Sequence, residues 1–488
     1  MHFAALPATR ATARPDAPCL TDEVLGTLTN EAFAARVATA AAVLAHHGLT
    51  PGGVVAVRLA NRTDLVVVLF AAWRLGAAVT PVNPALAASE VEYQVGDSGA
   101  VVLVTHDGLT LDGVTTLAPE DLVAGDDEQG AEAVEPDLDD LALLVYTSGT
   151  TGRPKGVELT HANLDAMTAA MVEAMALDEH DHSLLILPLF HVNGIVVSVL
   201  SPLRAGGQAT IAGRFDPRTF FTTLEQARPT YFSGVPAIYT MLANLPAEVE
   251  PDTSSLRFVA CGAAPMPAAL IGQVEERFGV VLVEGYGLSE GTCASTSNPL
   301  DGVRKPGTVG VALPGQTVAI MDPDGELLPQ GERGEIVIQG PTVMRGYLNK
   351  PEETAKTLQD GWLHTGDVGI LDEDGYLRIV DRVKDMIIRG GENIYPQEIE
   401  QAMLAHPAVL EAAVIGRPHA VMGEEPVAFV SVKDGASLDE DELIAFLTER
   451  IAKFKLPTQV TVIDEVPKNP VGKIDKPRLR ATVEPASI

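Results

Sequence analysis

The sequence is short of cysteine, of basic residues and of long hydrophobic runs, and each shortage excludes a class of protein. Its 488 residues include only three cysteines, Cys19, Cys261 and Cys293, without C-x-x-C spacing. An odd, widely spaced set of cysteines supports neither a disulfide framework nor a zinc site, and it is typical of a reducing compartment. Because no base paired with Cys261 or Cys293 can be identified, we interpret both as small packing residues rather than nucleophiles.

Basic residues are outnumbered by acidic ones, with 34 lysines and arginines against 66 aspartates and glutamates and a formal charge of −32. Such a field repels nucleic acid and anionic membrane surfaces, so neither is an expected partner. No apolar run approaches the roughly 18 residues that cross a bilayer, so we expect no integral membrane segment. The N-terminal residues lack a basic leader followed by a long apolar core, which favours a cytoplasmic protein.

Length and periodicity predict an α/β fold with more than one domain. A chain of 488 residues exceeds one ordinary core. Short Val/Ile/Leu runs alternate with Ala-rich amphipathic stretches, as in the predicted strand 54–59 and the predicted helix 65–75. After Gly302, turn residues separate short predicted strands at 334–339 and 376–380, which indicates a small β-rich subdomain.

Beyond Asp381 the pattern changes to α+β, which indicates a separate C-terminal domain. The elements predicted there are helix 396–404, strands 412–415 and 426–432, helix 439–452 and strand 459–462. We therefore predict a large N-terminal domain of βα-layered sheets over residues 1–381, which includes the β-rich subdomain, and a small mobile α+β domain over residues 385–488.

A loop rich in glycine and hydroxyl groups follows the predicted strand 141–146. Residues 146–156 read Tyr-Thr-Ser-Gly-Thr-Thr-Gly-Arg-Pro-Lys-Gly. Glycines let the backbone approach an anion closely, hydroxyls and exposed N–H groups donate to its oxygens, and Lys155 supplies positive charge. The segment is not a Walker loop, because that loop requires Gly-Lys-Ser or Gly-Lys-Thr. Composition alone therefore predicts an anion-binding loop and disfavours a P-loop NTPase.

The full string resembles the phosphate loop of the AMP-forming adenylating superfamily, which comprises acyl-CoA synthetases, peptide-synthetase adenylation domains and beetle luciferases. Further segments are similar to motifs of that superfamily and follow in the same order, so the resemblance covers the chain from about residue 20 to about residue 480. These segments are 261–265, 284–290, 364–367, 381–385, 390–396 and 470–473.

The resemblance implies that the chain binds ATP and Mg²⁺ and forms an acyl-adenylate. It assigns Tyr286 to adenine, Asp367 to the ribose hydroxyls and Glu290 to Mg²⁺, a cation that prefers carboxylate oxygens. Thr147 is the second residue assigned to the metal, and Ser289 stands where the family has threonine. The residues that the resemblance assigns to ATP and AMP are Thr147, Ser148, Gly149, Thr150, Thr151, Lys155, Gly262, Ala263, Ala264, Glu284, Gly285, Tyr286, Gly287, Ser289, Asp367, Val380 and Arg382.

The resemblance also implies two half-reactions in one cleft. Lys473 completes adenylation and is an implied catalytic residue, as are Glu290 and His191. The small domain then rotates about a hinge at residues 382–384, in which Lys384 has the hinge position, and the thiol enters through a tunnel. The residues implied to line the tunnel are Gly390, Gly391 and Glu392.

The acyl pocket implied by the resemblance is small and apolar. Its residues are Val192, Asn193, Val196, Val235, Ala260, Gly285 and Gly287. Gly287 stands where acetyl-CoA synthetases have a tryptophan that shortens the pocket, and Gly285 where malonyl-CoA synthetases have an arginine for a second carboxylate. We therefore expect a medium- or long-chain fatty acid. A hydroxycinnamate stays open as an alternative, although Ala260 replaces the lysine that some such ligases use. His191 is either a gate between pocket and tunnel or a core histidine.

The acceptor of the acyl group presents a phosphopantetheine thiol, which belongs either to CoA or to an acyl carrier protein. We expect CoA, for whose 3′-phosphate Arg389, Lys453 and Lys455 offer positive charge, and an acyl-acyl-carrier-protein ligase is the alternative. A luciferase-like oxidase acting on the adenylate is a further alternative. A sensor that binds AMP without catalysis is disfavoured, because the implied catalytic residues are all present.

Overall fold

The computed structural model describes residues 2–123, 133–134, 136–147, 153–264, 266–390, 392–419, 421–433, 435–468 and 474–483. The chain divides into two compact units. The first unit is Met1–Val318 with Val337–His364, and the second is Ala319–Ile336 with Thr365–Ile488. Within the described ranges, no helix is long and apolar enough to cross a membrane. The domain boundary at residue 381 stays a prediction.

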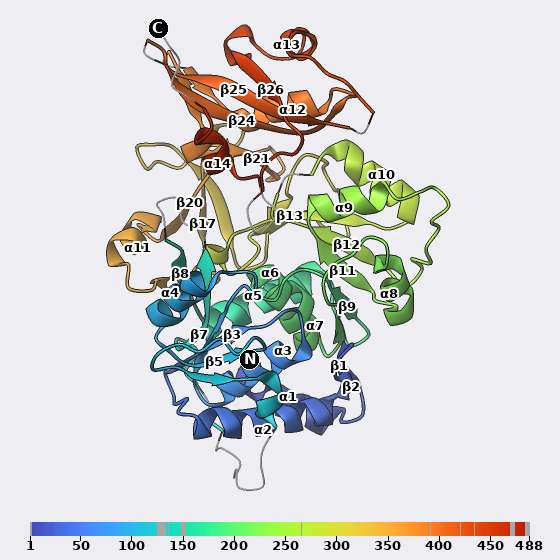
Figure 1. Ribbon diagram of the computed structural model, residues 1–488, viewed down its shortest axis with the longest axis vertical. Helices are drawn as coiled ribbons and strands as arrows, with labels where there is room; N and C mark the ends of the chain where they lie inside the picture. Colours follow the sequence, from blue (N-terminus) through green and yellow to red (C-terminus); the bar gives the residue numbers. More distant parts are fainter. Residues whose placement is uncertain are drawn as a thin grey trace. The chain divides into compact units, whose positions relative to one another are not determined.

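The first unit is built on two sheets with helices between them and on both outer faces (Figure 1). The larger sheet has nine strands in the order β15-β14-β13-β12-β11-β9-β10-β1-β2. Six neighbouring strands of this sheet are parallel to one another, in the order β1, β10, β9, β11, β12 and β13. The bounds are β1 Pro18–Asp22, β2 Gly26–Thr29, β9 His182–Leu185, β10 Gln208–Ile211, β11 Tyr231–Gly234, β12 Phe258–Cys261, β13 Leu282–Tyr286, β14 Thr296–Ser297 and β15 Val311–Ala312.

The other sheet of the first unit has seven strands in the order β18-β8-β7-β4-β3-β5-β6. Its Val-rich strands are buried on both faces: in β3, Val55 and Val57 pack on the helices between the sheets, and Val54 and Ala56 pack on the outer helix α4. The bounds are β3 Val54–Arg58, β4 Ala78–Pro81, β5 Ala100–Thr105, β6 Thr115–Leu117, β7 Leu141–Thr147, β8 Lys155–Thr160 and β18 Gly346–Tyr347.

Helix α3 (Thr63–Arg74) lies in the middle layer and contacts strands of both sheets. Its residues from Thr63 to Trp73 are all buried, which explains why it is apolar on every side instead of amphipathic. The other helices of the middle layer are α1 Leu6–Ala13, α2 Asn30–His46, α5 His161–Ala174, α6 Val192–Ile195 and α7 Ser201–Ala205. The outer helices are α4 Ala88–Ser98 on the seven-stranded sheet and α8 Phe220–Ala227, α9 Pro236–Ala243 and α10 Ala268–Phe278 on the nine-stranded sheet.

The second unit contains an antiparallel sheet in the order β23-β22-β25-β24, with β26 parallel to β25. Helices α12 and α13 cover one face of this sheet, and α14 packs on the other through Leu479. The larger part of a five-stranded sheet, β16-β17-β20-β19 with β21 beside β20, also belongs to this unit. The bounds are β16 Thr317–Met321, β17 Arg333–Gln339, β20 Trp362–Leu371, β21 Leu377–Arg382, β22 Ile387–Arg389, β23 Glu392–Ile394, α12 Pro396–Leu404, β24 Val409–His419, β25 Gly423–Val432, α13 Glu440–Thr448, β26 Gln459–Val462 and α14 Lys476–Arg480. Helix α11 Pro351–Thr357 and strand β19 Leu358–Gln359 belong to the first unit.

These observations confirm the α/β class, the β-rich segment after Gly302 and the small α+β C-terminal part. The predicted helix 396–404 and strand 459–462 have the predicted bounds. The predicted helix 439–452 is wrong at its end, since α13 stops at Thr448. The N–H groups of Arg450 and Ile451 both donate to the Leu447 carbonyl, at 2.9 Å each, which closes a tight turn in place of a further helical turn.

One buried histidine makes the first unit sensitive to acid. The His161 ring is 1 % exposed, packs against Trp73 at 5.8 Å between centroids, and makes no hydrogen bond through either ring nitrogen within the described residues. Burial lowers the pKa of His161 from 6.5 to about 4. The unfolded chain therefore takes up a proton near pH 6.5 that the folded chain does not bind until about pH 4, so stability falls as the pH falls between these values.

We predict that His161→Phe removes this loss. Between pH 7.5 and pH 5 the variant should gain about 2 kcal/mol of unfolding free energy relative to the parent protein. Urea unfolding followed by tryptophan fluorescence measures this difference, because both tryptophans, Trp73 and Trp362, belong to the first unit. The exposed His180→Gln serves as the control, and an identical pH dependence in His161→Phe and the parent would contradict the prediction.

Candidate active site

Many of the predicted site residues of the first unit lie where parallel strands end. Strands β11, β12 and β13 lie side by side, and their carboxyl ends are at Gly234, Cys261 and Tyr286 (Figure 1). Ligands of open parallel sheets bind beyond this edge. The fold therefore brings together three segments that are far apart in sequence. The predicted residues at this edge are Val235, Ala260, Gly262, Ala263, Ala264, Glu284, Gly285, Tyr286 and Gly287.

The turn after β12 is fixed by the neighbouring strands. Gly262 donates its N–H to the Gly234 carbonyl at 3.3 Å, and Ala263 adopts a φ of +70°, a strained value for a residue with a Cβ. The carboxylate of Glu284 accepts the N–H of Met266, which closes the turn. Burial raises the pKa of Glu284 to about 7, and its Oε2 has no partner in the described part of the chain. Glu284 is thus a buried group with one oxygen available to a ligand.

Gly285 and Gly287 are glycines for backbone reasons. A Cβ on Gly287 would lie 2.0 Å from the carbonyl oxygen of Cys293, and one on Gly285 would lie 2.9 Å from the carbonyl oxygen of Thr296. The missing side chain at 287 is therefore required by the close approach of residues 293–294 and does not by itself indicate a long pocket. The length of the acyl chain stays a prediction.

The segment before α6 is held by one amide. Asn61 donates from Nδ2 to the Leu187 carbonyl at 3.0 Å and accepts the Leu189 N–H on Oδ1 at 2.9 Å. His191 follows directly and is half-buried, with its ring 4.6 Å from that of Phe190. Both interpretations of His191 remain open. On the same segment, Val192 and Val196 are buried and Asn193 is half-buried.

The phosphate loop is flanked by two paired strands. Its central residues, 148–152, lie outside the described residues, so Ser148, Gly149, Thr150 and Thr151 stay predictions. Thr147 and Lys155 face each other in the antiparallel register of β7 and β8. The two ends of the loop are therefore close together.

Helix α4 anchors both flanks of that loop. Tyr146 donates its hydroxyl to Asp97 Oδ2 at 2.8 Å, and Tyr93 donates its hydroxyl to the Pro154 carbonyl at 3.0 Å. The guanidinium of Arg153 also lies 5.1 Å from the centre of the Tyr93 ring. Tyr93 and Asp97 lie on one face of the helix because they are four residues apart. The motif sequence gave no signal for either one, since each acts from outside the motif.

A second group of contacts joins Lys155 to Glu290. The Lys155 ammonium forms an ion pair with Glu353 and lies 5.0 Å from the centre of the Tyr347 ring. Tyr347 donates its hydroxyl to Glu290 Oε1 at 2.8 Å. Two residues that the sequence assigned to phosphate and metal, on separate motifs, thus share one aromatic neighbour. Tyr347 and Glu353 were missed because no local pattern marks them.

Glu290 fits the expected role toward Mg²⁺. Within the described ranges, no group of three or more histidine, cysteine, aspartate or glutamate side chains could form a metal site. Mg²⁺ that binds with nucleotide phosphates uses only one or two protein carboxylates and keeps several waters. The half-buried Glu290, whose Oε1 already accepts a hydrogen bond, would suit this role. Thr147 at the end of β7 is the other residue assigned to the metal.

The predicted residues of the second unit form their own group. Asp367 and Arg382 are cross-strand partners in β20 and β21, and Arg382 donates from Nε to Asp367 Oδ1 at 2.8 Å. Asp367 is buried and Val380 lies on the same strand as Arg382. The two residues assigned to the nucleotide in separate motifs are therefore neighbours. Lys473 and Gly391 lie outside the described residues.

The predicted hinge is tied to helix α12. Asp381 accepts the N–H of Arg382 at 2.7 Å and the N–H of Gln397 at 2.8 Å, and burial raises its pKa to about 6. Lys384 lies in the short turn Val383–Asp385, where burial and the nearby Arg382 lower its pKa. Gly390 has a φ of +61° and donates its N–H to the Met422 carbonyl at 2.8 Å. Glu392 pairs with Arg389 across β22 and β23.

All three cysteines are buried and free, which agrees with the interpretation of Cys261 and Cys293 as packing residues. Burial raises the pKa of Cys19 to about 11 and that of Cys293 to about 12, and it also raises that of Cys261. A thiolate is the reactive form of cysteine, so none of the three is suited to nucleophilic catalysis.

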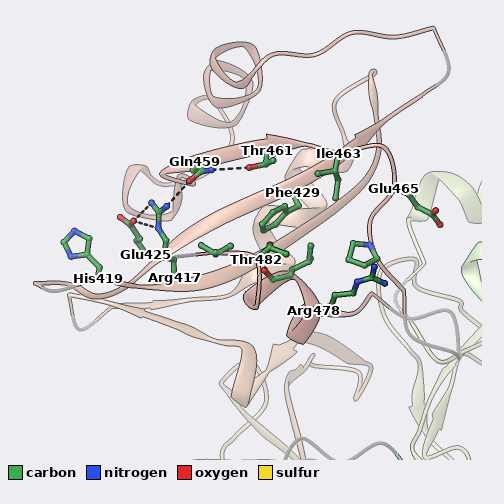
Figure 2. Close-up of a pocket in the computed structure, with 13 residues that line it drawn as sticks. Arg417, His419, Glu425, Phe429, Gln459, Thr461, Ile463, Glu465, Arg478 and Thr482 are labelled. Atoms are coloured by element: carbon green, nitrogen blue, oxygen red, sulfur yellow. Dashed lines mark hydrogen bonds and ion pairs between the residues drawn. The ribbon is translucent and has the colours of Figure 1, made fainter. Parts of the chain in front are cut away.

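A cavity of about 850 Å³ lies on the sheet face of the second unit that α14 covers only in part (Figure 2). Arg417, at one end, donates to Glu425 Oε1 from Nε at 2.9 Å and to Gln459 Oε1 from Nη1 at 2.8 Å (Figure 2). Its charge is therefore already satisfied within the protein. None of the predicted site residues lines this cavity, and we do not assign it to catalysis.

Comparisons with known proteins identify the family. The AMP-binding enzyme model matches residues 8–348, and the AMP-binding enzyme C-terminal domain matches residues 398–473. A feruloyl-CoA synthase from an Amycolatopsis species is 40% identical over 93% of both chains. A long-chain-fatty-acid–CoA ligase from Bacillus subtilis is 37% identical, over 90% of this chain and 87% of the relative. The crystal structure of ATP-bound MatB from Rhodopseudomonas palustris superposes with a TM-score of 0.92 at 35% identity, over 98% of both chains.

The chain therefore belongs to the family of AMP-binding enzymes, as its motifs predicted. Its relatives are named CoA ligases and CoA synthases, so it is an AMP-forming acid–CoA ligase. ATP is accordingly a substrate.

We predict that Tyr93→Phe weakens ATP binding. The variant loses the hydrogen bond to Pro154 and frees one flank of the loop, so the KM for ATP should rise about five-fold, the equivalent of one hydrogen bond. ATP–pyrophosphate exchange measures this constant. Tyr231→Phe is the matched control, because its hydroxyl also donates to a main-chain carbonyl, that of Val197 at 2.7 Å. An equal rise in both variants would show that the effect is not specific to the loop.

Proposed function

We propose that this ligase activates a medium- or long-chain fatty acid as the acyl-adenylate, releases pyrophosphate, and transfers the acyl group to CoA. The observation that carries the proposal is the contact group around Tyr347, in which a cation next to the phosphate loop and a carboxylate suited to Mg²⁺ share one neighbour. Such a pairing suits a triphosphate whose α-phosphorus is attacked while pyrophosphate leaves.

In the first half-reaction the substrate carboxylate attacks the α-phosphorus of ATP and the bond to pyrophosphate breaks. Lys155 and the hydroxyl groups of the loop bind the phosphates, and Glu290 would hold Mg²⁺, which supplies charge neutralisation for the leaving pyrophosphate when bound. Lys473 stabilises the charge that develops at the reacting carboxylate and phosphate. Tyr286, Asp367 and Arg382 bind the adenosine.

In the second half-reaction the CoA thiol attacks the acyl carbonyl and AMP leaves. A rotation about Lys384 withdraws Lys473 and brings the loop that contains Gly390 to the cleft, so one cleft serves both steps. The φ of +61° at Gly390 supports a conformation of this loop that favours glycine.

The small side chains of Val235 and Ala260 support an acid with an apolar tail. The Bacillus subtilis relative is named for long-chain fatty acids and supports the same choice. A hydroxycinnamate is the second candidate, because a relative with 40% identity is named feruloyl-CoA synthase. The half-buried Asn193, whose Oδ1 makes no hydrogen bond within the described residues, would suit the hydroxyl group of such an acid.

The names of the relatives favour CoA over a carrier protein as acceptor. Of the cations available for the 3′-phosphate, Lys455 forms an ion pair with Glu398 at 2.5 Å, and Arg389 donates to the Phe454 carbonyl at 2.9 Å with one of its nitrogens. Lys453 is exposed on the same turn and is the cation best able to meet the phosphate.

A panel of acids tests the substrate. We expect pyrophosphate release with saturated acids of eight to eighteen carbons and little release with acetate or malonate, and mass spectrometry should then find the acyl-CoA product. Preference for ferulate would select the second candidate. A product on a carrier protein but not on CoA, or an oxygen-dependent product, would contradict the proposed acceptor chemistry, and failure of every acid would refute the proposed reaction.

We predict that Lys473→Ala separates the half-reactions. Acyl-adenylate formation should be lost, because the developing charge is no longer stabilised, while thioester formation from supplied acyl-adenylate should stay within a few-fold of the parent. Rapid-quench measurements of each half-reaction test this separation. Lys468→Ala is the control, since Lys468 is bound to Glu411 at 2.7 Å. Equal losses in both half-reactions would contradict the assigned role.

A further inference from the structure

Tyr347 lies between two residues of the nucleotide site without belonging to either motif. Its ring centre is 5.0 Å from the Lys155 ammonium, and its hydroxyl donates to Glu290 Oε1 at 2.8 Å. Among the described residues, the hydrogen bond that engages the Glu290 carboxylate is this one, to Oε1. The contact therefore uses one carboxylate oxygen and leaves the other available.

The position of Tyr347 is fixed by its own backbone. Strand β18 pairs antiparallel with β8, where Tyr347 is opposite Val157, and the N–H of Tyr347 donates to Thr354 Oγ1 at 2.9 Å. The next residue, Leu348, donates to the Gly156 carbonyl at 2.8 Å, one residue from Lys155. The strand pair therefore sets the backbone of Tyr347 next to that of Lys155, and the ion pair with Glu353 holds the Lys155 ammonium.

The main chain of Glu290 is connected to the same segment. Its carbonyl accepts the N–H of Met344 at 2.8 Å, three residues before Tyr347. Glu290 is thus held at two points, once through its main chain and once through its carboxylate. Within the described part of the chain, the tyrosine hydroxyl is the group that fixes the rotation of the carboxylate itself.

We propose that Tyr347 is a positioning residue for the metal and phosphate site. Its hydroxyl orients the Glu290 carboxylate so that the second oxygen is available to Mg²⁺ bound with ATP, and its ring keeps Lys155 beside that carboxylate. The proposal rests on the proposed function, because it takes Glu290 as the carboxylate for the metal. Removing a residue that hydrogen-bonds to a metal ligand commonly lowers the affinity for the metal by roughly 10- to 100-fold.

Tyr347→Phe tests the proposal, because phenylalanine keeps the ring beside Lys155 and removes only the hydroxyl. We expect the Mg²⁺ concentration that half-saturates ATP binding to rise roughly 10- to 100-fold, while the KM values for the acid and for CoA stay unchanged. Calorimetry of ATP binding at a series of Mg²⁺ concentrations, without acid, measures this directly. Electron paramagnetic resonance of Mn²⁺ in the presence of protein and ATP gives a second measurement that does not depend on turnover.

Tyr231→Phe is the matched control. The Tyr231 hydroxyl also donates a hydrogen bond within the first unit, to the Val197 carbonyl at 2.7 Å, and Tyr231 is not a residue of the nucleotide or metal site. Its loss should leave the Mg²⁺ requirement unchanged. A change of less than two-fold in Tyr347→Phe, or an equal change in both variants, would overturn the positioning role.

Glu290 variants separate failure of this proposal from failure of the proposed function. Glu290→Gln should strongly weaken Mg²⁺-dependent ATP binding while leaving it measurable at high Mg²⁺, and adding Tyr347→Phe should then have no further effect, since the two act through one interaction. Additive effects would overturn the positioning role. Full Mg²⁺-dependent binding by Glu290→Gln would instead refute the role of Glu290 itself. Glu290→Asp, which draws the carboxylate away from the hydroxyl, should reproduce the effect of Tyr347→Phe in a protein that keeps the tyrosine.

Discussion

Thr147 and Lys155 face each other across the β7–β8 pair, and the candidate site of the first unit depends on that pairing. Strand β18 adds to the outer side of β8 and so brings Tyr347 beside Lys155. Helix α4 also contacts this strand pair, through Tyr93 on one flank of the loop and Asp97 on the other. A hairpin that closes a phosphate loop is thus braced by hydrogen bonds from two elements distant in sequence. The loop can remain rich in glycine, because its ends are fixed from outside.

Glu284 and Glu290 are six residues apart, but their different surroundings suit them to different roles. Glu284 is buried and its pKa is raised to about 7, so a large share of it is protonated at neutral pH. A protonated carboxyl is a poor ligand for a hard cation. Glu290 is half-buried, and its Oε1 accepts a hydrogen bond from the Tyr347 hydroxyl at 2.8 Å. The comparison supports Glu290 as the metal carboxylate, and it gives Glu284 the different task of closing the turn before Met266.

Much of the fold could be predicted because its signals are local. The apolar runs of β3 and α3 and the amphipathic helix 396–404 depend on residues within one element. The resemblance supplied the family and the residues of each motif. The roles of four residues could not be found in this way, because they arise from contacts between segments 49 or more residues apart. These residues are Tyr93, Asp97, Tyr347 and Glu353. At Gly287 the sequence instead suggested something that the structure explains differently. The missing side chain suggested a long acyl pocket, but the close approach of the Cys293 carbonyl already requires glycine there.

The reaction and the choice of acid depend on different kinds of interaction. The polar residues around the phosphate loop are mutually bonded, so losing one leaves a partner unsatisfied at a cost of roughly 1–3 kcal/mol. The implied acyl lining consists mainly of small apolar side chains, and adding or removing a methylene there changes discrimination by roughly 1–3 kcal/mol without leaving a buried polar group unpaired. Relatives of similar identity are accordingly named for ferulate and for long-chain fatty acids. Adenylation is therefore constrained by a connected network, whereas a substitution in the proposed acyl lining beside Val235 and Ala260 would alter the choice of acid without breaking that network.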